Sequence, residues 1–288
     1  MRITNKILVQ GYLSDLSNNL ENMQRLEGQL STGILVRKPS DDPFKAARVM
    51  EINTTISMYG RYKENMSEGQ DWLKTTDLTL GQVGDVLKRV HDLVVQASND
   101  TYDAPQRKSM AEEVSQLKEQ LVQVGNTNFN GKYIFGGDKT TSAPFVENSG
   151  VVSYNGSTVG LVKEFSQGVK MDIATTGDKF QDIFATLDEI IGNLNAGNSP
   201  SANMDTLEDE QDNILDLRAK AGAMSNRLDA MVSKNDDENL NMTELLSKTQ
   251  DVDIAQKVME FNVAENVYVA SLQTGAKVLQ PSILDFLK

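Results

Sequence analysis

The two ends of the chain carry regularly spaced apolar residues, and this spacing constrains the fold more than any other feature. Near the start, leucine and methionine recur at intervals of three and four residues between Leu13 and Leu30. Near the end, Ile254, Phe261 and Tyr268 recur at every seventh residue. Such spacing places apolar side chains on one stripe of a helix, which needs a covering surface. Because neither end has an obvious partner nearby in the sequence, we expect the end helices to pair with each other and with those of neighbouring molecules.

The terminal stripes also predict how the chain behaves before it assembles. Burial of a large aliphatic side chain contributes about 1.5–3 kcal/mol, whereas ordering the backbone costs roughly 1–2 kcal/mol for each residue. A lone helix of this kind is therefore expected to be loose in the free molecule and to fold as subunits assemble. The residues predicted to carry subunit packing are Leu13, Leu16, Leu20, Met23, Leu30, Ile254, Val258, Phe261, Tyr268, Leu272, Leu279, Leu284, Phe286 and Leu287.

The composition disfavours most binding and catalytic functions. Cysteine is absent, which removes disulfides, thiolate metal sites and cysteine nucleophiles, and the only histidine is His91. The net charge of −13 disfavours nucleic acid and anionic membranes as partners. No catalytic residue, cofactor site or metal site is therefore expected, and we predict that the protein is not an enzyme and has no small-molecule substrate.

The apolar segments are too short for a membrane span or a cleaved leader. No stretch approaches the roughly 20 apolar residues that cross a bilayer. The start of the chain is positively charged but lacks the apolar run of a secretory signal peptide. The sequence thus predicts a protein without a membrane span and without a conventional cleaved export signal.

Helical patterns occupy the first half of the chain. A helix is expected over residues 5–32, and a second should begin after Asp42, a good N-cap, and continue towards Tyr62. The strongest heptad pattern then covers residues 73–97. Asp103 begins a capping box that opens a further helix, which predicts an antiparallel helical hairpin.

In the middle of the chain, the helical pattern gives way to short strand and turn patterns. Residues 133–135 are predicted to form a strand, and Asn155-Gly156 is a typical hairpin-turn signal among further short strands. Asp178 is expected to cap a helix that follows them. A second long heptad run comes afterwards, and its polar stretch at residues 235–241 is interpreted as a junction or bend between two helical layers.

These elements predict a nested organisation. The expected fold is mainly α with a small β-rich insertion, arranged as an elongated nested helical bundle or coiled coil with paired terminal helices. Residues 1–40 with 250–288 would form a terminal coiled-coil domain. Residues 41–137 with 200–249 would form a helical-bundle rod domain, and residues 138–199 an inserted, β-rich outer domain.

Four motifs carry a family resemblance. The chain begins MRITN, and residues 33–47 read GILVRKPSDDPFKAA. Both stretches are similar to the N-terminal pattern of the flagellin superfamily of bacterial flagellar proteins. Residues 129–145, FNGKYIFGGDKTTSAPF, and residues 272–288, LQTGAKVLQPSILDFLK, resemble the member of that superfamily that forms the hook–filament junction. The resemblance covers nearly the whole chain.

The resemblance implies a structural role in the bacterial flagellum. It implies an adaptor that joins the hook, through hook-associated protein 1, to the flagellin filament, with its subunits associated in a ring. It implies that the terminal helices line an axial channel, so that the residues named above would carry axial subunit packing. It also implies export by the flagellar type III secretion apparatus, an export chaperone and an extracellular location at the junction.

Two other structural functions stay open at this point. The chain could be flagellin, the filament subunit itself. A secreted coiled-coil translocator that contacts membranes is an alternative from another class. The terminal stripes lack the Lys- and Arg-rich polar faces of membrane-surface helices, which disfavours the translocator.

Overall fold

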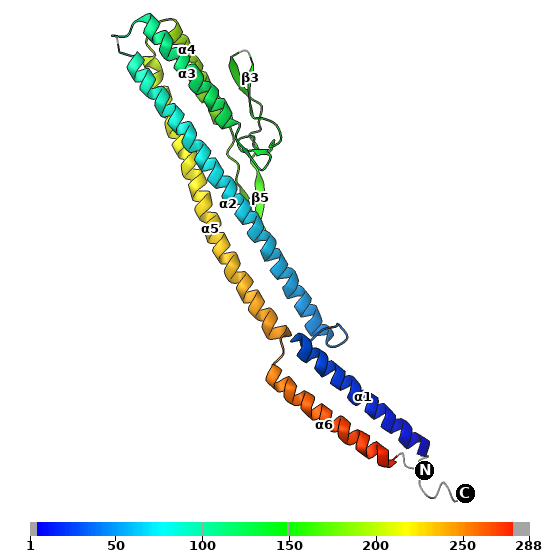
Figure 1. The fold of residues 1–288 in the computed structure, drawn as a ribbon. Helices are drawn as coiled ribbons and strands as arrows, with labels where there is room; N and C mark the ends of the chain where they lie inside the picture. Colours follow the sequence, from blue (N-terminus) through cyan, green and yellow to red (C-terminus); the bar gives the residue numbers. More distant parts are fainter. Residues whose placement is uncertain (1–4, 100, 149, 279–288) are drawn as a thin grey trace, which may run out of the picture. The chain divides into compact units, whose positions relative to one another are not determined.

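The computed structural model describes residues 5–99, 101–148 and 150–278, and it confirms a mainly α fold with a small β-rich insertion (Figure 1). The chain divides into two compact units. The terminal unit comprises Met1–Ser57 and Asn239–Lys288, and the middle unit comprises Met58–Glu238. The division into three domains given by the sequence stays a prediction. Within the described residues, no helix has the length and apolar character needed to cross a membrane.

The terminal unit is built on two antiparallel helices, α1 (Asn5–Thr32) and α6 (Ile254–Val278), which lie side by side in Figure 1. The bounds of α1 confirm the predicted first helix. At one end of the pair, main-chain hydrogen bonds connect the segment that follows α1 to the segment that precedes α6. Leu35 N donates to Gln250 O at 2.7 Å, and Val252 N donates to Gly33 O at 3.0 Å. These bonds satisfy backbone groups that the helix ends leave without partners.

The helix α2 (Pro43–Ala97) begins as the sequence predicts but continues much further than expected. Asp42 Oδ1 accepts hydrogen bonds from the backbone N–H groups of Phe44 and Lys45 at 3.1 and 3.0 Å, which confirms its capping role. The helix does not end near Tyr62, because buried Met66 and Trp72 extend its packed face into the heptad region.

Four helices form the core of the middle unit. The helix α2 lies along α5 (Met204–Gln250), where Arg218 Nε donates to Asp77 Oδ1 at 3.0 Å. The helix α3 (Ala104–Gly125) packs on α4 (Asp178–Asn195), as Figure 1 shows. The capping box that Asp103 forms with Gln106 is present, with both hydrogen bonds at 3.1 Å. Buried residues confirm the predicted heptad seams, namely Leu80, Val83, Leu87, Val90, Val94, Val114, Leu121, Ile214 and Leu228.

The insertion contains three separate two-stranded antiparallel sheets rather than one larger sheet. They are β1 (Asn128–Phe129) with β2 (Lys132–Tyr133), β3 (Phe145–Asn148) with β4 (Val151–Tyr154), and β5 (Val162–Ser166) with β6 (Val169–Asp172).

Two local predictions in the insertion are wrong. The strand expected over residues 133–135 ends at Tyr133, because Ile134 and Phe135 are both fully buried and a strand would turn them to opposite faces. Asn155-Gly156 does not form the hairpin turn, which lies between Asn148 and Val151. Gly156 instead lies against the ring of Tyr154, where an added Cβ would be 2.4 Å from Cζ.

Two further boundaries differ from the sequence interpretation. Asp178 is the first residue of α4, whose N-cap is Gly177 without a side-chain bond, so Asp178 does not cap the helix. The polar stretch at residues 235–241 does not interrupt α5, which is continuous through it. The division between the two units nevertheless falls inside this stretch, between Glu238 and Asn239.

Candidate assembly interface

The interface between α1 and α6, here called the seam, has heptad spacing on both helices. Side chains on the seam are less exposed than those on either side of it, and their spacing alternates between three and four residues as expected for paired helices. The seam consists of Val9, Tyr12, Leu16, Asn19, Met23, Leu26 and Leu30 on α1, with Phe261, Ala264, Tyr268, Ser271 and Gly275 on α6.

The two helices are in close contact at Tyr12 and Gly275. A Cβ added to Gly275 would lie 2.1 Å from both Cζ and the hydroxyl oxygen of Tyr12, so only glycine allows this contact. The Tyr12 hydroxyl donates a hydrogen bond to the Ser271 carbonyl oxygen at 2.9 Å. The sequence analysis missed both residues. Their signal is the spacing itself, because Tyr12 precedes Leu16 by four residues and Gly275 follows Tyr268 by seven.

The predicted packing residues separate into three groups. Leu16, Met23, Leu30, Phe261 and Tyr268 lie on the seam and are partly buried. Four others, Leu279, Leu284, Phe286 and Leu287, lie outside the described residues. The remaining five, here called the open row, are between 41% and 61% exposed: Leu13, Leu20, Ile254, Val258 and Leu272. Ile254 continues the heptad of Phe261 and Tyr268 at the start of α6, and the other four lie off the seam.

Further apolar side chains extend the exposed surface of α6. Met259 and Val263 are each 62% exposed, and Val267 and Val269 are also exposed. A soluble monomer rarely presents so many large apolar side chains on one element, and such a surface is typical of a protein–protein contact. This arrangement offers area for packing rather than groups for chemistry.

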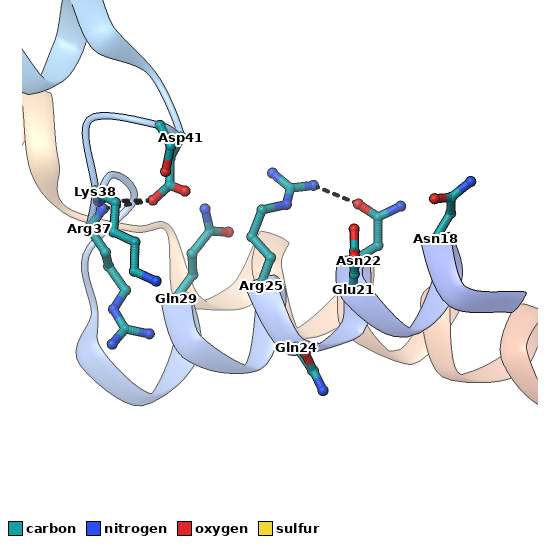
Figure 2. A pocket seen from close by; sticks show the side chains of 10 residues that line it. Asn18, Glu21, Asn22, Gln24, Arg25, Gln29, Arg37, Lys38 and Asp41 are labelled. Carbon is teal, nitrogen blue, oxygen red and sulfur yellow. Dashed lines mark hydrogen bonds between the residues drawn. The ribbon is translucent and has the colours of Figure 1, made fainter. Parts of the chain in front are cut away.

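A hollow of about 830 Å³, here called the trough, lies between α1 and the loop that connects it to α2. Figure 2 shows the row along α1 that lines it, formed by Asn18, Asn22, Arg25 and Gln29. The loop contributes four further residues, which are Arg37, Lys38, Ser40 and Asp41.

Hydrogen bonds fix the loop side of the trough. Asp41 Oδ2 accepts from the backbone N–H groups of Arg37 and Lys38 at 3.1 and 3.0 Å (Figure 2). Gln29 is 5% exposed, and its Nε2 donates to the Leu35 carbonyl at 2.8 Å. The Gln29 Oε1 atom has no hydrogen-bond partner among the described residues. A buried acceptor without a donor costs about 1–3 kcal/mol.

The charged groups of α6 next to the seam form a local cluster. The ammonium of Lys257, 2.5 Å from the Glu260 carboxylate, and the amide of Gln256 hold the pKa of Glu260 below its ordinary value. In the part of the chain that the structure describes, no three His, Cys, Asp or Glu side chains are grouped to hold a metal ion. Asp41 and Asp42 both bind backbone N–H groups, as expected of loop and cap residues.

Comparison with known proteins gives one family match. Residues 3–140 match the bacterial flagellin N-terminal helical region. Flagellar hook-associated protein 3 of Escherichia coli (strain K12) is 27% identical, over 94% of this chain and 95% of the relative. The corresponding values for hook-associated protein 3 of Salmonella typhimurium are 25%, 95% and 96%. Flagellin of Bacillus subtilis is 27% identical over 91% of this chain and 90% of its own length.

Solved structures share the fold. A putative flagellar hook-associated protein from Vibrio parahaemolyticus superimposes with a TM-score of 0.64 and 22% identity, covering 73% of this chain and 100% of that protein. Bacillus cereus FlgL superimposes with a TM-score of 0.60 and 21% identity, covering 68% and 99%. These likenesses confirm the architecture of paired long helices with small antiparallel sheets.

Proposed function

We propose that the chain belongs to the flagellin superfamily and acts as a hook–filament junction protein of the bacterial flagellum, an adaptor between hook-associated protein 1 and flagellin. The similarity to hook-associated protein 3 and to flagellin extends over more than nine-tenths of the chain in each case, 94% and 91%. A subunit that is similar to the filament subunit along most of its length could pack against flagellin on one side. Its other side would pack against hook-associated protein 1.

The open row on the terminal helix pair is the observation that carries this proposal. Its side chains are between 41% and 61% exposed, so the pairing of α1 with α6 leaves them largely uncovered. Equivalent helices of neighbouring subunits would bury them. Since about half of each side chain is still exposed, completing the burial contributes on the order of 1 kcal/mol for each residue. The proposed mechanism is therefore geometric, and subunits join because each completes the apolar packing of the next.

Export is part of the same proposal. We infer that subunits leave the cell through the flagellar type III apparatus without a cleaved signal peptide, with the help of a chaperone, and associate in a ring at the junction. A chain without cysteine supports this route, because no disulfide can form before export.

Replacement of Leu272 by aspartate tests the mechanism. Purified Leu272→Asp protein should fail to add to hooks that carry hook-associated protein 1, because it places a charge in the open row. Its helical circular dichroism should stay close to that of the wild type, since Leu272 is exposed. Leu215→Asp is the matched control, because Leu215 is 58% exposed and lies in the part of α5 that belongs to the middle unit. Normal addition by the Leu272 variant, with loss confined to the control, would refute the role of the open row.

Flagellin is a second candidate function, favoured by the 27% identity to the Bacillus subtilis filament protein over most of the chain. The two functions differ in self-assembly. A filament subunit propagates long filaments from purified protein once seeded, whereas a junction protein stops after a layer on the hook end. Electron microscopy of seeded, purified protein separates the two outcomes.

A further inference from the structure

We propose that the trough binds a helix of a neighbouring subunit that presents a ridge of carboxylates. The inference rests on the proposed function in one respect, which is that a neighbouring subunit supplies this helix. It concerns a polar surface of the terminal unit that is separate from the open row.

The lining of the trough extends along α1. Its row on α1, from Asn18 to Gln29, advances by four, three and four residues. Eleven residues of α-helix extend about 16 Å, which equals three turns of a partner helix. A single small ion would contact only one end of such a row. The extent of this row therefore favours a helix laid alongside α1.

The charge of the trough favours an acidic partner. Arg25, Arg37 and Lys38 line it and are exposed, and no carboxylate among the described residues forms an ion pair with them. Of the two acids in the lining, Asp41 already accepts two backbone N–H groups of the loop, and Glu21 is the other. The lining thus carries 3 − 2 = +1 in a chain of net charge −13. Complementary charge of this kind steers association and selects the partner.

The trough has built features beyond its surface cations. Gln29 is buried, its Nε2 is held by the Leu35 carbonyl, and its Oε1 is left as an acceptor without a donor. The Arg37 guanidinium lies over Gly28, where an added Cβ would be 2.6 Å from Nη1. Gly28 therefore provides the space that places this cation beside α1. The Arg37 cation is therefore held in place along α1, where a carboxylate of a partner helix could pair with it.

The chain itself carries the kind of ridge that fits. Asp205, Asp209, Asp212 and Asp216 on α5 are all exposed and advance by four, three and four residues, the same spacing as the row that lines the trough. No lysine or arginine occurs between residues 204 and 217. A ridge of this form in a superfamily neighbour is the expected occupant.

A peptide binding experiment tests the inference directly. The probe is a fluorescent, alanine-based helical peptide with aspartates at this spacing, and its counterpart has asparagine at the same positions. Fluorescence anisotropy with the full-length chain at low salt should show binding of the aspartate peptide only, and the affinity should fall as salt rises. The triple variant Arg25→Glu, Arg37→Glu, Lys38→Glu should weaken binding about tenfold or more. Glu21→Gln should strengthen it.

The matched control is the triple variant Lys88→Glu, Lys108→Glu, Lys220→Glu, which reverses three exposed lysines of the middle unit. It changes the net charge equally and should leave binding unchanged. Equal weakening by the control, equal binding of the asparagine peptide, or no binding by the wild type would each overturn the inference. A chain that binds the peptide but does not add to hooks would refute the proposed function and leave the trough assignment intact.

Discussion

At the scale of single residues, Gly275 determines how closely α6 approaches α1. Any side chain there would overlap the Tyr12 ring, whose atoms lie 2.1 Å from the position of an added Cβ. Gly275→Ala should therefore open the seam and destabilise the helix pair by about 1–3 kcal/mol, as overpacking does elsewhere. Amide hydrogen exchange should show faster exchange along α1 and α6, with the middle unit unchanged.

Gly222→Ala is the control for this substitution. No heavy atom outside its own helix lies within 4 Å of a Cβ at this exposed position of α5, so the higher helix propensity of alanine should stabilise the protein by up to about 1 kcal/mol. If Gly275→Ala left exchange in both terminal helices unchanged, the close contact with Tyr12 would not hold the pair together.

Glu210 is a buried carboxylate that we expect to make the stability of the protein depend on pH. It is 7% exposed, and burial raises its pKa, with Asp182 and Asp209 adding to the shift, while Asn213 and Lys179 oppose it. The folded state therefore binds a proton more tightly than the unfolded state. The free energy of unfolding should fall as pH rises from the ordinary value of 4.5 through the raised pKa of this group.

Glu210→Gln should remove that fall and raise the unfolding free energy at pH 7 by about 1 kcal/mol, because no charge is then buried. Urea unfolding of the full chain between acid and neutral pH measures both effects. Glu112→Gln, at an exposed position of α3, should keep the pH dependence of the wild type. An unchanged slope in Glu210→Gln would mean that another group causes it.

At the scale of elements, the β5–β6 hairpin is held on α2 by one buried ring and two polar contacts. Phe165 is fully buried against Gly69, Lys163 Nζ lies 2.6 Å from Glu68 Oε2, and Asn65 donates to the Glu164 carbonyl at 3.1 Å. Lys163 holds the pKa of Glu68 below its ordinary value, so this attachment weakens as pH falls through that lowered pKa.

Gly69→Ala should displace the hairpin without unfolding the helices. The added Cβ would lie 2.9 Å from Phe165 Cε1 and 3.1 Å from Leu228 Cδ1, both tighter than ordinary contact. We expect a loss of about 1–3 kcal/mol and faster proteolysis within residues 155–176. Gly84→Ala, where the added Cβ has open space, should not change proteolysis there. Equal cleavage in both variants would contradict this account of the attachment.

The helices were predictable because their signal is periodic and local, whereas the contacts between elements were not. The 3–4 spacing and the Asp42 cap predicted α1 and the start of α2 from the sequence. The turn at Asn155-Gly156 was mispredicted because the Tyr154 ring packs over Gly156, a tertiary contact that no turn rule contains.

The candidate site was only half predictable for the same reason. A heptad shows that a helix has an apolar stripe, but the partner helix decides which neighbouring row becomes the seam. Tyr12 and Leu16 therefore took the seam position, and Leu13 and Leu20 were left in the open row. The trough had no sequence signal, since it depends on the loop folding back over Gly28.

At the scale of the whole molecule, net charge and apolar packing oppose each other during assembly. Every subunit carries a net charge of −13, so like copies repel, while the open row favours contact. Sodium chloride reduces the repulsion by screening, and sulfate also strengthens apolar burial because it is excluded from the protein surface. Addition of the wild type to hook ends should thus increase with salt, and more with sulfate than with chloride at equal ionic strength.

The salt series also separates the two surfaces of the terminal unit. Sedimentation of labelled protein with hooks measures addition, and Leu272→Asp should stay deficient at every salt concentration because screening does not restore the lost apolar contact. Peptide binding at the trough should move in the opposite direction and weaken with salt. If addition to hooks fell steadily as salt rose, ionic contacts rather than the open row would drive assembly, since screening weakens attractions between opposite charges as it weakens repulsion between like charges.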